Sequence, residues 1–354
     1  MKIQIMLVNY LRNVQGLFSL SFQILNELTF FHLNTIAVLT SGGDAPGMNA
    51  AVRAVVRSAE HFGYQVKTIS HGYKGLIKGE FKPLEHDDVS GIIQNGGTVL
   101  KTARSKEFRT KEGRAKAAEN LRNEDVQALI TIGGDGTFRG ATLLGREHGI
   151  NVIGIPATID NDLIGTDDTI GYDTALNTAL EAIDKIRDTA DAHERLFFVE
   201  VMGRDAGFIA LETGIAGGAE IIVLPEYLTK VDEIRDALKR TVEKQKRSTL
   251  VVVAEGDQSG GAIRLCGELE DDFPNYEMRV CILGHVQRGG NPTANDRVLA
   301  SRLGYESVRA LYEGQSEVMV GVINNELVLT PLEETFGKIK EIDHELVELS
   351  KVLR

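Results

Sequence analysis

The chain has 354 residues, enough for two domains that each bury a core of their own. Its 42% hydrophobic and 25% charged residues are typical of a globular protein, and its net charge of −12 argues against nucleic acid or an anionic membrane as a partner. Its two cysteines, Cys266 and Cys281, lack the spacing of metal ligands, so we expect free thiols in a reducing cytoplasm.

Residues 1–34 form an apolar but interrupted segment. Polar residues such as Asn9, Arg12 and Gln23 leave no apolar run of about 20 residues, the length that spans a bilayer. No small-residue cleavage site follows a hydrophobic core, so we do not expect a signal peptide. One interpretation is an amphipathic accessory helix. We favour an N-terminal extension from an early start codon, with nothing catalytic in it.

From residue 35 onward, short apolar runs typical of buried strands alternate with helical patterns. We expect strands at residues 35–40, 64–70, 129–132, 152–155, 196–201, 221–225 and 249–256, and helices at 48–61, 138–146, 175–188 and 231–246. Gly63 is placed to end the first helix. This order predicts an α/β fold with mainly parallel sheets, a domain boundary near Gly171 and a return crossing near residues 284–290.

Glycine-rich loops follow several expected strands, and ligands bind at the carboxyl ends of strands in such sheets. The loop SGGDAPG (41–47) leads from the first strand into a helix, so the backbone N–H of Gly43 and its neighbours can hold a phosphate. The alternative is a tight turn that needs glycine for steric reasons. A second glycine motif, at 133–137, weakens that alternative.

This second motif, GGDGT, follows an apolar run and precedes a helical pattern. Its glycines let the backbone approach a phosphate, and the helix N-terminus would point at that anion. Asp135 offers an oxygen ligand for Mg²⁺, with a turn aspartate as the structural alternative. NAD kinases and lipid kinases share the motif, so alone it indicates a phosphate-donor site.

The segment PATIDND (156–162) follows the next strand and carries a hydroxyl and two carboxylates to the same edge. Asp160 and Asp162 are two residues apart, so in an extended segment both project to one side. One of them can accept the proton of an attacking hydroxyl; the alternative is a pair that caps a turn. A phosphate cradle beside paired carboxylates predicts phosphoryl transfer to an alcohol, as in a sugar-phosphate kinase.

Arginines stand in or beside glycine-rich loops, where a guanidinium can bind phosphate oxygens through two hydrogen bonds. MGRDAG (202–207) and LGHVQRGG (283–290) are the clearest examples, the second with His285. A solvated surface arginine commonly explains any single position, and a lone histidine is more often structural. The set as a whole is harder to explain in that way: Arg104, Arg195, Arg204, Arg279 and Arg288.

The order of these motifs resembles that of the bacterial ATP-dependent 6-phosphofructokinases, from residue 35 to about residue 329. The set is SGGDAPGMNAA, IGGDGT, TIDND, EVMGR, IAGGAE, LGHVQRGG and DRVLASRLG. The resemblance implies two similar three-layer α/β domains with mainly parallel sheets. It also implies transfer of the ATP γ-phosphate to the 1-hydroxyl of fructose 6-phosphate with Mg²⁺. A cytoplasmic homotetramer with active sites shared between subunits is implied too, activated by a nucleoside diphosphate and inhibited by phosphoenolpyruvate.

The resemblance assigns residues to domains and roles. A nucleotide-binding domain would comprise residues 35–171 and 286–337, and a sugar-phosphate-binding domain 172–285 and 338–354. Catalysis would fall to Asp160 as general base, Asp162 near Mg²⁺, Thr158 and Arg204, with Asp135 holding the metal. The nucleotide site would comprise Gly43, Arg104, Ser105, Gly134, Asp135, Gly136 and Thr137. The sugar-phosphate site would comprise Thr158, Ile159, Asp160, Met202, Gly203, Arg204, Glu255, His285, Val286, Gln287 and Arg288, with Arg195 and Arg279 from a neighbouring subunit. The effector site would comprise Arg53, Arg57, Arg187, Gly218, Ala219, Glu220, Lys246, Arg247 and Ser248.

Departures from the family pattern bear on the phosphate donor. Pyrophosphate-dependent relatives resemble GGDD, with a lysine before the TIDND threonine, whereas Gly136 and Ala157 stand here. Glycine leaves room for the inner phosphates of a nucleotide, so we expect ATP as donor. Ser105 and Lys106 stand where an aromatic residue and a proline are common, so contacts to the adenine are expected to differ.

Three other functions compete with this interpretation. Gly136 argues against a pyrophosphate-using enzyme of the same fold. An intact set of five residues argues against a catalytically silent nucleotide sensor: Asp135, Thr158, Asp160, Asp162 and Arg204. An NAD kinase would share GGDGT but gives no reason for TIDND, MGR and HVQR.

Overall fold

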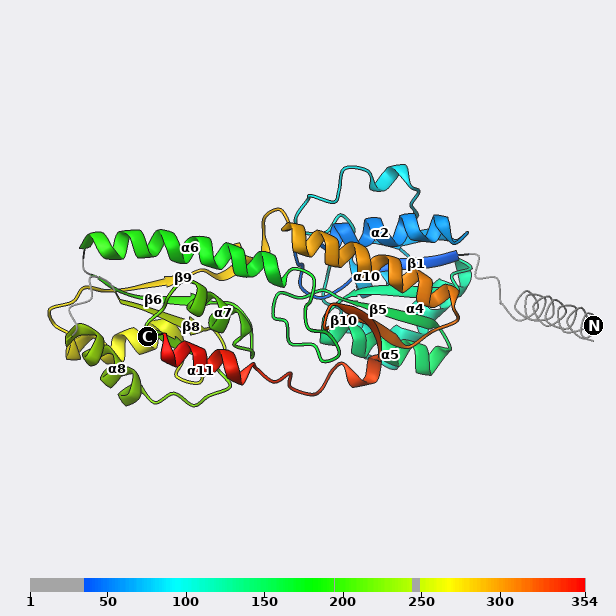
Figure 1. Ribbon diagram of the computed structural model, residues 1–354. Helices are drawn as coiled ribbons and strands as arrows, with labels where there is room; N and C mark the ends of the chain where they lie inside the picture. The colour runs from blue at the N-terminus through cyan, green and yellow to red at the C-terminus, as the bar shows by residue number, and fades with distance from the viewer. Residues whose placement is uncertain (1–34, 194, 244–248, 354) are drawn as a thin grey trace, which may run out of the picture. The chain divides into compact units, whose positions relative to one another are not determined.

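The computed structural model describes residues 35–193, 195–243 and 249–353, and its strands form two sheets (Figure 1). The strands are β1 Thr35–Thr40, β2 Gln65–Ile69, β3 Phe81–Pro83, β4 Ala128–Gly133, β5 Asn151–Pro156, β6 Leu196–Val201, β7 Ile221–Val223, β8 Thr249–Ala254, β9 Met278–Ile282, β10 Val318–Ile323 and β11 Glu326–Pro331. The α-helices are α2 Met48–His61, α3 Gly72–Lys78, α4 Lys111–Asn123, α5 Asp135–His148, α6 Tyr172–His193, α7 Phe208–Ala216, α8 Val231–Glu243, α9 Gly261–Leu269, α10 Ala294–Tyr312 and α11 His344–Val352. The 3₁₀ helices are η1 Asp87–Val89, η2 Glu107–Arg109, η3 Glu270–Asp272, η4 Gly284–Arg288 and η5 Leu332–Glu334. The extension expected at residues 1–34 lies outside the described residues.

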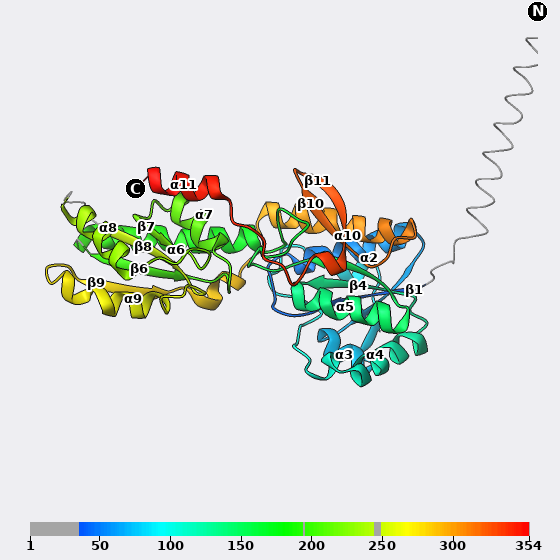
Figure 2. The same cartoon turned by 90° about the horizontal axis from the view of Figure 1, so that it is seen from below.

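The first sheet has the strand order β11-β10-β5-β4-β1-β2-β3. Its five central strands run parallel, and the edge strands β3 and β11 are antiparallel to their neighbours. Every residue of β1 and β4 is buried, as in parallel strands that are covered on both faces. Helices α3, α4 and α5 share a core with the sheet that includes Leu129 and Phe138, and α2 and α10 pack together on its other face (Figures 1 and 2).

The second sheet is parallel throughout, with the order β7-β8-β6-β9. Alternate residues of β6 and β8, such as Phe198 and Val251, share a core with Leu238 of α8 and Leu265 of α9. Helices α6 and α7 contact the sheet outside that core and therefore cover its other face. The predicted α/β class with mainly parallel sheets is confirmed.

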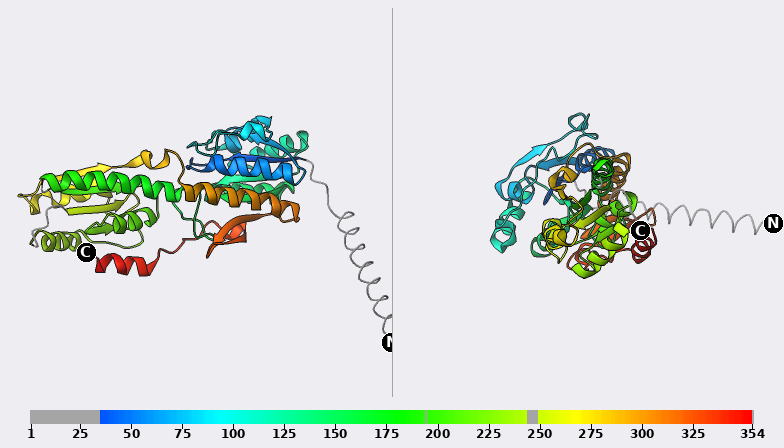
Figure 3. Two further views of the ribbon diagram at one scale, coloured as in Figure 1. Left: turned by 45° about the horizontal axis from the view of Figure 1, so that its top comes forward. Right: turned by 90° about the vertical axis from the view of Figure 1, so that its left-hand side faces the viewer.

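Helices α6 and α10 carry the chain between the sheets and meet at their N-termini (Figures 1 and 3). The carboxylate of Asp296, on α10, accepts hydrogen bonds from the backbone N–H of Gly171 (2.7 Å) and Thr174 (2.8 Å) at the start of α6. In return, Asp173 of α6 accepts from the hydroxyl of Thr293, which precedes α10. Asp296 therefore caps α6, and Asp173 holds the Thr293 hydroxyl, which in turn caps α10 by accepting from the Asp296 backbone N–H.

Several element boundaries differ from the prediction. Helix α5 begins at Asp135 and not at 138, because extended Gly134 forms its N-cap and the GGDGT motif is itself the first turn. The hairpin β10–β11 was not predicted, although its turn residues Asn324 and Asn325, with φ of 52° and 65°, were a usable signal. In the described ranges, no helix has the length and apolar character needed to cross a membrane.

Candidate active site

Three loops meet at the carboxyl ends of β1, β4 and β5. The backbone N–H of Ser41 donates to Ile132 O (3.0 Å), and the Thr137 hydroxyl donates to Ser41 O (3.0 Å). The backbone N–H of Ala157 donates to Gly133 O (3.0 Å). The motifs SGGDAPG, GGDGT and PATIDND therefore lie side by side, because carboxyl ends of parallel strands share one edge of a sheet.

Glycines at this edge serve two different purposes. A Cβ added to Gly133 would lie 2.4 Å from the carbonyl oxygen of Ser41, so this glycine permits two loops to pack closely. A Cβ added to Gly43 would lie 2.8 Å from Nη1 of Arg288. At Gly136, by contrast, an added Cβ meets no described atom within 4 Å. The first turn of α5 therefore faces open space.

The carboxylates of Asp160 and Asp162 lie in the loop after β5. The Asp160 side chain is 9% exposed, its Oδ1 accepts no hydrogen bond from the described residues, and Nη2 of Arg288 lies 3.9 Å from that oxygen. Burial, and then the charge of Asp162, raises the pKa of Asp160 to about 6. Burial and the charge of Asp135 also raise the pKa of Asp162. A buried carboxylate that titrates near neutrality and lacks a donor is suited to accept a proton.

A turn, and not an extended segment, places these two carboxylates near each other. Asn161 lies between them with φ of 51°, in the left-handed region that asparagine tolerates. Its side-chain amide donates to Asp167 O (3.0 Å), and the backbone N–H of Asp160 donates to the Thr158 hydroxyl (3.1 Å). The predicted proximity is present, but the extended geometry that we assumed for it is wrong.

The second sheet supplies basic groups that face these carboxylates. Arg204 follows β6 with φ of 57°, and its backbone N–H donates to Glu255 Oε1 (2.8 Å). Its Nη1 lies 3.7 Å from Asp135 Oδ1. Arg288, at the end of η4, faces Asp160. The structure therefore brings residues from the carboxyl ends of both sheets together.

Other predicted sugar-phosphate residues either support this region or lie exposed in it. The backbone N–H of Met202 donates to Oε1 of Gln287 (3.4 Å), and the Gln287 side chain is buried. Gly203 has φ of 144°, in a range that favours glycine. His285 and Val286 are exposed on η4. Gln287 and Gly203 therefore shape the loops, whereas His285 is available to a ligand.

Residues 35–311 match the model of a protein family described as Phosphofructokinase. The chain belongs to the phosphofructokinase family.

Similar proteins cover nearly all of the described chain. "ATP-dependent 6-phosphofructokinase 2" of Bacteroides thetaiotaomicron is 54% identical over 318 residues, which are 90% of this chain and 98% of the relative. "ATP-dependent 6-phosphofructokinase 1" of Thermus thermophilus is 56% identical over 321 residues, 91% of this chain and 99% of the relative. The solved structure of phosphofructokinase from Saccharomyces cerevisiae matches with a TM-score of 0.80 and 39% identity, covering 90% of this chain and 46% of the yeast chain. The resemblance that we drew from the motifs is confirmed.

Two predicted substrate residues lie at the opposite end of the second sheet. Arg195 precedes β6 and Arg279 lies near the start of β9, and both guanidinium groups pair with Glu277. Met202 follows the same strand β6, seven residues beyond Arg195, which corresponds to roughly 23 Å at about 3.3 Å per residue. Within one chain, therefore, these two arginines do not converge with Arg204.

The loop before η2 lies against the first glycine loop. The hydroxyl of Thr102 donates to Gly42 O (2.8 Å), and the hydroxyl of Thr40 donates to Lys101 O (3.1 Å). Arg104 is exposed in this loop, close in sequence to those anchors. The Ser105 hydroxyl accepts from the Phe108 backbone N–H (3.2 Å), so it stabilises η2. The structure thus gives Ser105 a local role, beside a loop that borders the predicted nucleotide site.

The predicted effector residues fall on different sheets. Arg53 and Arg57 lie on α2, which packs over the first sheet. Arg187, on α6, donates to Gly218 O (2.7 Å) near the second sheet, and Glu220, just before β7, accepts from the Leu250 backbone N–H (2.7 Å). Ala219, between them, is buried. The remaining predicted residues lie outside the described residues: Lys246, Arg247 and Ser248.

Two carboxylates are suited to a magnesium ion. Asp135 is half-exposed at the first turn of α5, and its charge raises the pKa of Asp162 across the loops. Among the described residues, no group of three or more His, Cys, Asp or Glu side chains is placed to hold a metal. Magnesium is commonly bound by one or two carboxylates together with water and substrate phosphates, so this sparse donor set fits it.

Sequence reasoning missed two side chains that support the site. The Tyr73 hydroxyl donates to Thr137 O (2.5 Å), and its ring stacks on Phe108 with centroids 3.8 Å apart. Nζ of Lys340 donates to Asp167 O (2.8 Å), in the loop that follows Asp160 and Asp162. Both contacts join distant parts of the sequence; a tyrosine among the glycines of HGYKG was a weak signal for the first, and nothing in the sequence indicated the second.

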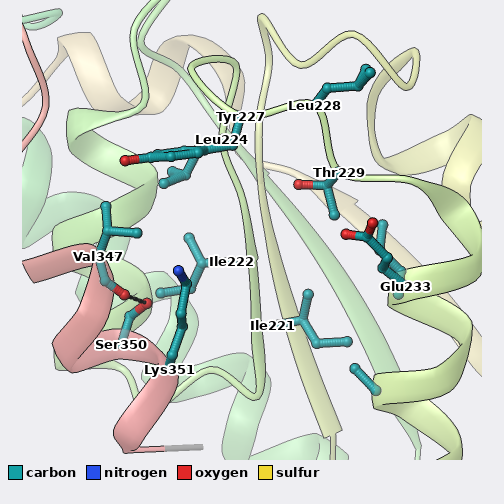
Figure 4. A pocket seen from close by; sticks show the side chains of 12 residues that line it. Ile221, Ile222, Leu224, Tyr227, Leu228, Thr229, Glu233, Val347, Ser350 and Lys351 are labelled. Carbon is teal, nitrogen blue, oxygen red and sulfur yellow. Dashed lines mark hydrogen bonds between the residues drawn. The ribbon is translucent and has the colours of Figure 1, made fainter. Parts of the chain in front are cut away.

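A cavity of about 300 Å³ lies apart from these residues, beside β7, α8 and α11 (Figure 4). Apolar side chains such as Ile222, Leu224 and Val347 line it, with Glu233 and Lys351 among the polar ones. No residue that we assigned to the nucleotide, sugar-phosphate or effector sites is part of its described lining.

Proposed function

We propose that this chain is an ATP-dependent 6-phosphofructokinase. It transfers the γ-phosphate of ATP to the 1-hydroxyl of fructose 6-phosphate and yields fructose 1,6-bisphosphate and ADP, the committed step of glycolysis. The observation that carries this proposal is the buried Asp160 carboxylate, which accepts no hydrogen bond from a described residue and faces Arg288. A base beside a phosphate-binding edge is the arrangement that transfer to an alcohol requires.

Asp160 accepts the proton of the attacking 1-hydroxyl. Its pKa of about 6 lies far enough below 7.5 for the carboxylate to be mainly ionised there, yet high enough for effective proton transfer. Arg204 and Arg288 stabilise the negative charge of the phosphoryl oxygens, and Thr158 contacts the transferred group. Sugar-phosphate binding falls to Met202, Gly203, Arg204, Glu255, His285 and Arg288, with Ile159 and Gln287 shaping the loops.

ATP lies over the first sheet, where the open space at Gly136 accommodates its inner phosphates. Gly43 and Gly134 bring backbone N–H groups to the phosphates, and Arg104 reaches the nucleotide from the neighbouring loop. Thr137 shapes this site, because its backbone N–H donates to Gly134 O (2.9 Å) and its hydroxyl to Ser41 O. Asp135, with Asp162 nearby, would hold Mg²⁺, which would supply positive charge to the phosphate oxygens. Because an aspartate at 136 would fill the open space, ATP is favoured over pyrophosphate as donor.

The distribution of basic groups supports a shared, regulated assembly. Since Arg195 and Arg279 lie at the far end of the second sheet, we propose that they reach the sugar phosphate of a neighbouring subunit in a homotetramer. The two halves of the effector set likewise lie on different sheets, and an interface between subunits joins them. The domain division at 35–171 plus 286–337 and 172–285 plus 338–354 and the cytoplasmic location belong to the same proposal.

Phosphoryl transfer to fructose 6-phosphate with Mg²⁺, measured with ATP and with pyrophosphate in parallel, tests the function. We expect turnover with ATP alone. Turnover with pyrophosphate would overturn the donor assignment. Failure with both donors, in a folded and tetrameric protein, would instead favour the silent nucleotide sensor.

A further inference from the structure

Lys340 connects the catalytic loop of the first sheet to helix α7 of the second. It lies in the segment between η5 and α11, and its Nζ donates to Asp167 O (2.8 Å). The same ammonium lies 5.3 Å from the ring centroid of Phe208, the first residue of α7. A cation at that distance from an aromatic ring is attracted to it, so a single side chain contacts both elements.

The carbonyl that Lys340 binds is connected to Asp160 and Asp162 through one hydrogen bond, made by the residue between them. Asp167 O also accepts a hydrogen bond from the side-chain amide of Asn161 (3.0 Å). Asn161 stands between Asp160 and Asp162 and holds the left-handed backbone that turns them toward each other. Lys340 and Asn161 therefore converge on one oxygen, and the lysine braces the turn from outside.

Negative charge surrounds this lysine on several elements. The negative charges of Asp162, Asp167 and Asp168 in the loop, and of Glu212 on α7, interact with its ammonium. Glu212 in turn accepts a hydrogen bond from the Tyr172 hydroxyl (2.8 Å) at the start of α6. Burial lowers the pKa of Lys340 while these carboxylates raise it, and lysine and carboxylates stabilise one another.

Asp162 thus interacts with two cations, Arg204 and Lys340. Arg204 belongs to the sugar-phosphate loop and is mostly exposed, so a bound substrate would engage it. Lys340, in contrast, already donates a hydrogen bond to Asp167 O, so the chain itself holds this side chain in place without substrate.

We propose that Lys340 is a positioning residue for phosphoryl transfer, which fixes the Asp160–Asp162 turn against α7 through the carbonyl of Asp167. This inference rests on the proposed function. It predicts a loss in turnover more than in substrate affinity, because the lysine supports the carboxylates and not the arginines that hold the sugar phosphate.

The test compares three variants with the unsubstituted full chain. Lys340→Met keeps the length of the side chain and removes its charge, Lys340→Arg keeps charge, donors and ring contact, and Lys338→Met changes an exposed lysine of the same segment. We expect Lys340→Met to lower kcat by about tenfold with KM for both substrates within about twofold, Lys340→Arg to recover most of the loss, and Lys338→Met to match the unsubstituted chain.

The other outcomes would refute either the positioning role of Lys340 or the proposed function. The positioning role would be refuted by near-normal kcat in Lys340→Met or by an equal loss of kcat in Lys338→Met. It would also be refuted if Lys340→Arg were as slow as Lys340→Met. Loss of activity only together with loss of the thermal unfolding transition would also refute it and make the lysine structural. Absence of transfer by the unsubstituted chain would refute the proposed function and with it this inference.

Discussion

The carboxyl edges of the two sheets contribute opposite charges in opposite environments. At the first edge, the Asp160 side chain is 9% exposed and lacks a donor for Oδ1 among the described residues. At the second edge, the Arg204 side chain is 60% exposed, and the carboxylates of Asp205 and Asp135 lie 3.6 and 3.7 Å from its guanidinium. An exposed pair of this kind contributes about 0–1 kcal/mol, so it does not hold the arginine in place.

The folded chain alone therefore sets the pKa of Asp160, whereas Arg204 needs a bound phosphate as its main charge partner. Burial and neighbouring charge already set the pKa of Asp160 near neutrality without a ligand. Arg204, in contrast, has only exposed carboxylates as partners in the free chain, and we expect phosphate oxygens to pair with it when substrate is bound. Substitution of the buried Asp160 should therefore change turnover and leave fructose 6-phosphate affinity nearly constant, whereas substitution of the exposed Arg204 should weaken that affinity.

The largest expected effect is that of Asp160→Asn. Removal of the base should lower turnover by about 10²–10⁴-fold while KM for fructose 6-phosphate stays nearly constant. Steady-state kinetics measures both quantities. Asp191→Asn, on the exposed surface of α6, serves as control and should leave both unchanged. Near-normal turnover in Asp160→Asn would contradict the assigned role.

Arg204→Ala should weaken fructose 6-phosphate binding, which Asp160→Asn leaves nearly constant, in addition to lowering turnover. Loss of the guanidinium should raise KM for fructose 6-phosphate at least about tenfold, because charged hydrogen bonds to phosphate are lost. The unfolding temperature should stay the same, since the exposed ion pair adds little to stability. A variant that loses stability but keeps its KM would contradict this assignment, because Arg204 would then stabilise the fold and not bind the sugar phosphate.

Gly136→Asp tests the open space in front of α5. Because an added Cβ meets no described atom within 4 Å, the variant should fold normally, and an acidic residue in the first turn of a helix is favourable. KM for ATP should rise about tenfold through crowding and repulsion of the phosphates. Gly136→Ala is the matched control and should bind ATP almost normally. Unchanged ATP affinity in the aspartate variant would contradict the placement of the phosphates.

The final effect concerns not catalysis but stability and its pH dependence. Folding raises the pKa of Asp160 from 3.8 to about 6, so the folded state binds more protons and this residue's contribution to stability falls as pH rises between those values. Asp160→Asn should therefore be more stable than the unsubstituted chain above pH 6, by on the order of 3 kcal/mol, and lose this advantage below pH 4. Denaturant unfolding at pH 4 and pH 7.5 measures it. An advantage independent of pH would show that Asp160 titrates normally.

Much of the scaffold was predictable because it depends on local patterns. The apolar runs that form β1, β6 and β8 are unfavourable in water and therefore become buried strands. Glycine motifs directly after them indicate the turns at the strand ends. The hairpin β10–β11 escaped prediction because its outer strand alternates weakly and lies at an edge of the sheet.

The sequence alone determined which chemical groups stand at the strand ends and, through the order of its motifs, the family to which the chain belongs. Only the tertiary structure decided their environments. The pKa of Asp160 depends on burial and on Asp162, the turn between these two depends on Asn161 and the distant Lys340, and the far position of Arg195 depends on the length of β6. Burial and charge coupling arise from groups far apart in the chain, so no local pattern of residues records them.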